Sequence, residues 1–160
     1  MTIRPARPAD RNAIWAILEP TIRAGETYTL PRNMEQEEAL AYWFSGENTV
    51  FVADHNGEVL GSYYVRANQK GGGAHVCNCG YMTADWASGR GVATAMCEHS
   101  LEYARSQGFR AMQFNFVVSS NEPAIHLWQK FGFAVVGRLP EAFLHPRLGY
   151  VDALVLYRAL

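Results

Sequence analysis

A glycine-rich stretch directly before a helix constrains this chain more than any other feature. In "DWASGRGVATAM", residues 85–96, Gly89 and Gly91 let the backbone turn tightly and come close to a bulky group. The helix that follows offers unpaired N–H groups and a partial positive charge at its N-terminus. The combination predicts a seat for a phosphate group, although an ordinary strand-to-helix turn could use the same residues.

Two common phosphate-binding motifs do not fit this stretch. A dinucleotide fingerprint needs Gly or Ala at the position of Thr94, and a P-loop needs a Gly-Lys-Ser/Thr sequence that does not follow. The stretch also comes after the fourth predicted strand, whereas both motifs normally follow an early one. If this stretch binds phosphate, the protein belongs to a class other than these two.

Hydrophobic periodicity and turn residues predict eleven elements. Strands are expected at residues 2–7, 49–54, 59–67, 75–84, 110–118, 134–139 and 150–157, and helices at residues 8–26, 33–45, 91–109 and 123–133. Pro20 should kink or end the first helix, and Asn33 with Gln36 should cap the second. The pair Asn56-Gly57 predicts a hairpin.

The order of these elements predicts one α/β domain over residues 1–160. Two hairpins surround a strand–helix–strand unit, whose crossover should be right-handed with parallel strands. The expected architecture is an α+β mixed sheet, antiparallel and parallel, of about six or seven strands with helices on both faces. A chain of 160 residues can bury a core of its own.

Composition narrows the kinds of molecule that the chain is expected to bind and the compartment in which it is expected to work. The net charge is -1, so nothing in the composition suggests nucleic acid or an anionic membrane surface as a partner, and neither is expected. Three cysteines are an odd number without a disulfide framework, and the N-terminus lacks an apolar signal stretch, so we expect a cytoplasmic protein. His75, Cys77 and Cys79 alternate along one strand, which does not suit a tetrahedral site, and no metal is expected.

Two longer segments resemble the GCN5-related N-acetyltransferase (GNAT) superfamily. "GRGVATAMCEHSLEYARSQGF" is similar to its acetyl-coenzyme A loop and following helix, and "FNFVVSSNEPAIHLWQKFGF" to its "N…A…(Y)…GF" segment. The resemblance implies a GNAT-like fold in which acetyl-CoA is the cosubstrate. It implies that backbone N–H groups of residues 89–94 hold the pyrophosphate, and that a bulge in the fourth strand splays it from the fifth. The cofactor residues it implies are Tyr81, Met82, Thr83, Ser88, Gly89, Arg90, Gly91, Val92, Ala93, Thr94, Asn121 and Trp128.

The chain departs from the family pattern at two positions. Ser88 stands where Gln or Arg is usual, and Arg90 could supply the missing contact. Trp128 stands where a tyrosine usually donates a proton to the leaving thiolate, and an indole has no acidic proton near pH 7. The usual assignment of the general acid therefore does not carry over.

Two asparagines on adjacent predicted strands point to the catalytic centre. Asn78 and Asn115 should flank the gap between the fourth and fifth strands, and strands disfavour asparagine. The chain resembles the GNAT branch that includes the yeast proline-analogue acetyltransferase, which acts on azetidine-2-carboxylate. In that branch the matching asparagines are the implicated substrate and catalytic residues, and a tryptophan matches Trp128.

These features lead to a functional hypothesis with open alternatives. We expect an N-acetyltransferase in which a small amine, such as a cyclic imino acid, attacks the thioester directly, and N–H groups near Met82 and Thr83 stabilise the oxyanion. Glu26, Thr27 and Tyr28 are candidates for the acceptor pocket, or else form a solvated loop on which Tyr28 packs. A peptide acetyltransferase and a non-catalytic acyl-CoA sensor are the alternatives. A homodimer is expected, with residues 150–157 as the shared surface.

Overall fold

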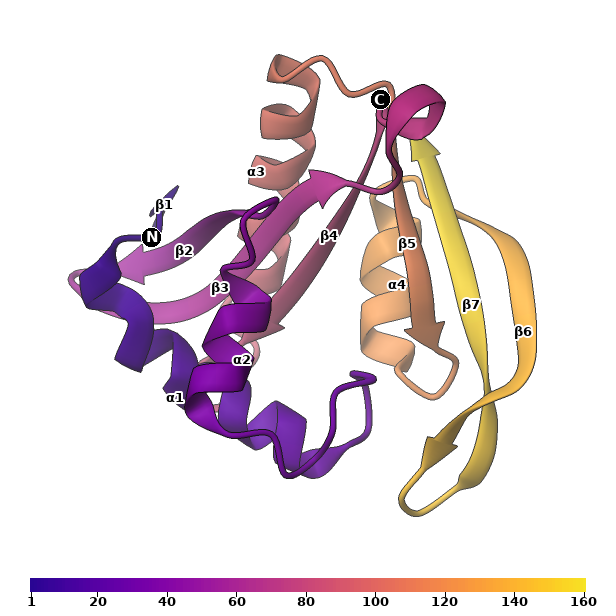
Figure 1. The fold of residues 1–160 in the computed structure, drawn as a ribbon, viewed down its shortest axis with the longest axis horizontal. Helices are drawn as coiled ribbons and strands as arrows, with labels where there is room; N and C mark the ends of the chain where they lie inside the picture. Colours follow the sequence, from indigo (N-terminus) through magenta and orange to yellow (C-terminus); the bar gives the residue numbers. More distant parts are fainter.

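A seven-stranded mixed sheet runs through the computed structural model, which describes residues 1–160 (Figure 1). The spatial order of the strands is β1-β2-β3-β4-β5-β7-β6. Neighbouring strands are antiparallel except β4 and β5, which are parallel. The expected mixed sheet is confirmed, with strands β1 (Thr2–Pro5), β2 (Thr49–His55), β3 (Glu58–Ala67), β4 (Val76–Thr83), β5 (Ala111–Val118), β6 (Ala134–His145) and β7 (Gly149–Ala159).

Four α-helices cover the two faces of this sheet (Figure 1). They are α1 (Arg11–Ala24), α2 (Gln36–Trp43), α3 (Val92–Ser106) and α4 (Glu122–Lys130). On the α1/α2 face, Trp43 donates from Nε1 to Ser62 Oγ at 2.9 Å. On the opposite face, Tyr81 contacts Ser100 of α3 and Trp128 of α4. The order of elements is the one that the sequence predicts. None of the helices has both the length and the hydrophobicity to cross a membrane.

Pro20 does not end the first helix, and the second helix lacks the predicted cap. Pro20 lies inside α1, which continues to Ala24 and ends at Gly25 with φ 65°. The buried stripe of Ile14, Ile17, Leu18 and Ile22 holds this helix against the sheet, and that burial outweighs the one hydrogen bond that proline removes. The second helix begins at Gln36 after Glu35, without a side-chain cap, so Asn33 does not cap it.

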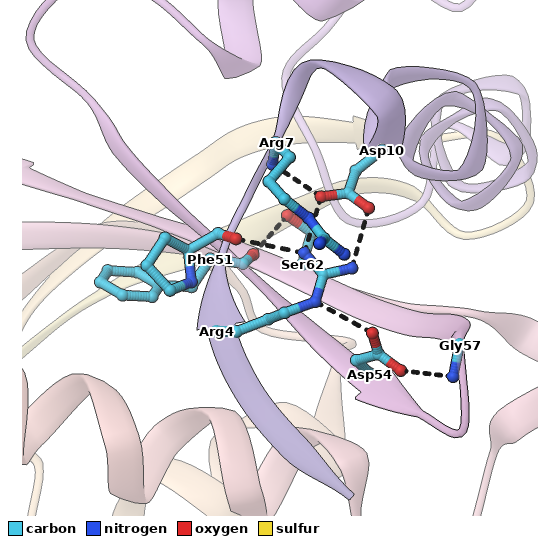
Figure 2. Close-up of polar contacts among 8 residues, drawn as sticks. Arg4, Arg7, Asp10, Phe51, Asp54, Gly57 and Ser62 are labelled. Atoms are coloured by element: carbon cyan, nitrogen blue, oxygen red, sulfur yellow. Dashed lines mark hydrogen bonds and ion pairs between the residues drawn. The ribbon is translucent and has the colours of Figure 1, made fainter.

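The chain's N-terminus is tied to the sheet by a cluster of charges (Figure 2). Arg4 of β1 contacts Asp10 at 2.8 Å and Asp54 of β2 at 2.9 Å. Asp10 also accepts from the Arg7 backbone N–H at 2.6 Å. The Arg4 guanidinium holds the pKa of the Asp10 carboxyl below its usual range. One arginine thus joins β1, β2 and the turn that leads into α1.

The two parallel strands pair over a short distance and then separate (Figure 1). Only Val76–Ala111 and Cys77–Met112 are in register across β4 and β5. The β3–β4 ladder runs from Gly61–Thr83 to Ala67–Cys77 without a shift. The bulge expected in the fourth strand is therefore absent, and the irregularity lies in β5, where the pairing with β7 shifts between Phe114 and Val117.

Candidate active site

A cavity of ≈ 620 Å³ occupies the gap between β4 and β5. Its walls come from both strands, the α1–α2 loop, α2, β3 and α4. None of the residues that line it is Asp, Glu, Lys, Arg or His. The cavity is lined by Thr21, Thr27, Tyr28, Thr29, Tyr42, Tyr64, Asn78, Cys79, Gly80, Tyr81, Met82, Thr83, Ala93, Phe114, Asn115, Phe116, Val117, Val118, Asn121, Pro123, Ala124, Leu127 and Trp128.

The two candidate catalytic asparagines both line this cavity. Asn78 follows Cys77, the last residue of β4 that pairs with β5. Its Nδ2 donates to the backbone carbonyl of Gln113 in β5 at 2.9 Å. The side chain thereby crosses the gap where the ladder has stopped. Asn115 lies in the irregular part of β5, and its Oδ1 accepts from Gln113 Nε2 at 2.9 Å. The structure brings the two residues together through Gln113.

Aromatic rings form the wall of the cavity on the α3/α4 side. The Trp128 ring lies 4.9 Å from that of Tyr81 and 4.8 Å from that of Phe114, measured between centroids. The Ser100 hydroxyl donates to the Cys97 carbonyl at 2.8 Å, so the Tyr81 hydroxyl, 2.7 Å from Ser100 Oγ, is the donor in their contact. The hydroxyl proton of Tyr81 therefore points away from the cavity, and Tyr81 lines the cavity with its ring.

The loop between α1 and α2 closes the opposite side of the cavity. Tyr28 Oη donates to the Tyr81 carbonyl at 2.9 Å, and Thr27 also lines the cavity. Glu26 does not line it. Its carboxylate contacts Arg147 Nη1 of the β6–β7 turn at 3.0 Å. The structure therefore places two of the three candidate acceptor residues at the cavity, and the third in a surface ion pair.

The glycine loop precedes α3 at the edge of the cavity. Gly89 and Gly91 have φ of 77° and 78°, in the left-handed region that glycine adopts without strain. The backbone N–H groups of Gly89 and of residues 91–94 donate to no acceptor in the protein. Of the loop residues, Ala93 reaches the cavity wall. The Val92 side chain is buried against Gly61, so only its backbone could contact a ligand.

The β3–β4 ladder determines which N–H groups of β4 face the gap. Asn68 N–H donates to the Val76 carbonyl, and Ala84 N–H to the Leu60 carbonyl, so even-numbered residues of β4 point their backbone groups at β3. Odd-numbered residues alternate with them. The N–H groups of Tyr81 and Thr83 therefore face the cavity, while that of Met82 faces β3. Met82 contributes its side chain to the wall but not an oxyanion donor, which corrects the expectation for that residue.

Burial keeps the titratable side chains of the cavity uncharged. Removal from water raises the pKa of Tyr28, Tyr64 and Tyr81 above the usual range of a phenol. The same cause, with the neighbouring Cys77, raises the pKa of the Cys79 thiol. Cys79 is therefore a protonated thiol near neutral pH and a poor nucleophile. No group of three or more His, Cys, Asp or Glu side chains in the structure is arranged so that it could hold a metal ion.

Comparison with known proteins decides the family. The model of the acetyltransferase (GNAT) family matches residues 13–133. The chain belongs to the GNAT family. A GCN5-related N-acetyltransferase from Kribbella flavida is 42% identical, with a TM-score of 0.94 over 99% of this chain and 97% of that one. The resemblance seen in the sequence is thus confirmed, and the chain is an N-acetyltransferase.

Two further relatives of this GNAT protein are more distant. N-acetyltransferase aca1 of Schizosaccharomyces pombe is 26% identical over 84% of this chain and 72% of its own length. The GNAT phosphinothricin acetyltransferase of Sinorhizobium meliloti, solved in complex with AcCoA, is 21% identical and has a TM-score of 0.85 over 99% of this chain and 88% of that one. The second likeness shows the fold alone.

Sequence reasoning missed several residues of the GNAT cavity. Gly80 lies under the Tyr64 ring, and a Cβ there would come within 2.4 Å of Tyr64 Cε2. A glycine inside a strand signals such a close approach, so this contact could have been predicted. Tyr42, whose hydroxyl lies 3.3 Å from that of Tyr64, carries no comparable signal. Asn68 and Gln113 were visible as polar residues, but only the fold places them beside Asn115.

Proposed function

We propose that this single domain, residues 1–160, is an acetyl-CoA-dependent N-acetyltransferase for a small amine. The observation that carries the proposal is the uncharged cavity between β4 and β5, with both asparagines on its wall. Unpaired N–H groups at the start of α3 lie next to it. The cavity joins a candidate phosphate seat to a candidate acceptor site, which an acyl transfer between two substrates requires.

The glycine loop fits the pyrophosphate of acetyl-CoA. Five N–H groups, from Gly89 and residues 91–94, have no protein acceptor and are available to phosphate oxygens. A side chain at Gly91 would meet no heavy atom within 4 Å, so the space in front of the loop is open. Arg90 and Ser88 are exposed beside it and are candidates for further contacts. Tyr81, Thr83, Asn121 and Trp128 are candidates for the thiol-bearing arm.

The residues around the gap suit a direct attack by the amine. Acetyl-CoA supplies an acetyl group activated as a thioester. The N–H groups of Tyr81 and Thr83 are available to stabilise a developing oxyanion. Asn78 and Asn115 orient the acceptor, so proximity supplies much of the rate. No covalent acyl-enzyme is part of this proposal, because the only thiol of the cavity, Cys79, stays protonated.

The chemistry of the walls favours a small acceptor without net charge. A polyamine carries positive charge away from the reacting nitrogen, and the cavity offers no carboxylate to pair with it. A zwitterionic cyclic imino acid such as azetidine-2-carboxylate carries no net charge. The amide N–H groups of asparagine can donate to its carboxylate. We therefore propose small imino acids as acceptors, with peptide amines as the alternative.

Two features support proposals about the oligomeric state and the cellular location of the protein. The edge strand β6 and its turn expose apolar side chains, and such edges are usually covered. We propose that they form the contact of a homodimer together with Tyr150, the exposed end of the expected surface 150–157, of which Ala153, Leu154 and Leu156 are buried in the sheet. Cys77, Cys79 and Cys97 are free thiols, which suit the reducing cytoplasm that we propose as its location.

Turnover of acetyl-CoA with a panel of amines tests the proposed function. The purified protein should release free thiol fastest with small cyclic imino acids, more slowly with lysine peptides and polyamines. Asn78→Ala and Asn115→Ala should each lower acceptor kcat/KM by about 10²-fold, the scale of one lost preorganised donor. Calorimetry should show unchanged acetyl-CoA binding in both variants. Binding without turnover of any amine would favour the acyl-CoA sensor, and a strong preference for peptides would contradict the small acceptor.

A further inference from the structure

The side-chain amides of Gln113, Asn115 and Asn68 form a continuous hydrogen-bonded chain along the α1/α2 face of the gap, and Asn78 is linked to it through the backbone carbonyl of Gln113. Asn78 Nδ2 donates to the Gln113 carbonyl at 2.9 Å. The Gln113 side chain donates from Nε2 to Asn115 Oδ1 at 2.9 Å. Asn115 in turn donates from Nδ2 to Asn68 Oδ1 at 2.6 Å. Asn78 and Asn115 line the cavity, while Gln113 and Asn68 do not.

Asn115 depends on these hydrogen bonds because the sheet does not hold it. The β4–β5 register ends at Cys77–Met112, and the β5–β7 register passes from Phe114 directly to Val117. Asn115 therefore has no partner in either neighbouring strand, and its side chain is exposed. Its rotamer and the direction of its amide are set by Gln113 on one side and Asn68 on the other.

The hydrogen bonds that Asn115 makes within the protein leave part of its side-chain amide free to bind a ligand. An asparagine amide has two N–H donors and two lone pairs on its oxygen. Gln113 uses one lone pair and Asn68 uses one N–H. One donor and one acceptor remain at a residue of the cavity wall. An amide chain can also run in the reverse direction, and the donor and the acceptor would then exchange places.

We propose that Gln113 and Asn68 are positioning residues that fix the direction of the Asn115 amide. They hold Oδ1 of Asn115 toward Gln113 and Nδ2 toward Asn68. The substrate that accepts the acetyl group therefore always meets the remaining lone pair and N–H of Asn115 in the same places. An imino acid offers a matching pair of groups, an amine N–H and a carboxylate oxygen, because its nitrogen and its carboxylate are attached to the same carbon. This inference rests on the proposed function, and it assigns the acceptor's orientation to two residues outside the cavity.

Two isosteric variants with the same added charge test the direction of the chain. Asn68→Asp keeps an oxygen that accepts from Asn115 Nδ2, so the arrangement survives. Gln113→Glu replaces the donor to Asn115 Oδ1 by an oxygen, which forces the Asn115 amide to rotate by half a turn. Each variant replaces one NH₂ group by oxygen and places one negative charge next to Asn115, so each serves as the control for the other.

Steady-state kinetics with the best imino acid, a calorimetric titration of acetyl-CoA and a thermal melt should be recorded for both variants. Gln113→Glu should lower acceptor kcat/KM by up to about tenfold, the scale of one lost hydrogen bond. Asn68→Asp should stay near the wild type, and Asn68→Ala should fall between the two. Acetyl-CoA affinity and melting temperature should change little in all three.

The outcomes separate this inference from the proposed function. Equal acceptor kinetics in the two charged variants would overturn the inference, and so would a loss confined to Asn68→Asp, because the chain would then run in reverse. In both cases an active wild-type protein leaves the proposed function standing. A wild-type protein that acetylates no amine would contradict the proposed function and, with it, the role of Gln113 and Asn68.

Discussion

At the scale of single residues, Gly91 is where a substitution should separate cofactor binding from folding. The residue has φ 78° and open space in front of its Cα. Gly91→Glu would place a carboxylate at the unpaired N–H groups that we assign to the pyrophosphate, and like charges repel there. We expect acetyl-CoA binding to be lost in a protein that remains folded, as measured by isothermal titration and circular dichroism.

A matched control exists for this substitution at the β2–β3 turn. Gly57 has φ 89° and equally open surroundings, so Gly57→Glu adds the same charge and comparable backbone strain at a residue that lies outside the glycine loop and does not line the cavity. It should bind acetyl-CoA like the wild type. Unchanged affinity in Gly91→Glu would show that the loop does not hold the pyrophosphate.

At the scale of elements, the carboxylate of Asp10 links β1 to the turn before α1. Its pKa is lowered chiefly by the hydrogen bond from Arg4, so the unfolded chain binds more protons at low pH than the folded protein does. The stabilisation is complete above the unfolded pKa of about 4, and it is lost as the pH falls through the lower folded value. Asp10→Asn should cost about 2 kcal/mol near pH 7.

Thermal or urea unfolding between pH 7 and pH 3 measures this dependence. The difference in the free energy of unfolding between wild type and Asp10→Asn should shrink as the pH falls below about 4. Asp85→Asn is the control, because Asp85 is exposed and has no ion-pair partner. A difference that stays constant with pH would mean that the Arg4–Asp10 pair does not stabilise the fold.

The helices and strands also show how much of the fold could be predicted from the sequence alone. Alternating and helical periodicity predicted the order of strands and helices, and glycine with asparagine predicted the β2–β3 turn, where Asn56 and Gly57 have φ of 54° and 89°. The expected helix of residues 8–26 was found as Arg11–Ala24, but the cap at Asn33 was wrong, and Pro20 did not end the first helix because tertiary burial holds its buried face against the sheet. Contacts such as Asn115–Asn68 join residues that are distant in the sequence, and local patterns carry no information about them.

At the scale of the whole molecule, the exposed apolar side chains of the β6–β7 hairpin predict assembly. Val136, Leu144, Leu148 and Tyr150 are 60%, 60%, 61% and 67% exposed, and an edge strand offers unpaired backbone groups beside them. Light scattering should give twice the 17.9 kDa of the chain. Leu144→Lys should shift the mass toward the monomer, whereas Gln107→Lys, on exposed backbone after α3, should not. A wild-type mass of one chain at micromolar concentration would contradict the dimer.

The short β4–β5 junction also bears on how the sheet moves. Beyond Cys77–Met112 and the hydrogen bond from Asn78, no ladder holds the β1–β4 half at a fixed distance from the β5–β7 half. A rotation about the paired end would displace the far ends of the strands, near Thr83 and Val118, the most. A molecule lying in the gap would touch both halves at once. It would therefore stiffen the sheet as well as fill the cavity, and the rigidity of the protein would depend on its ligand.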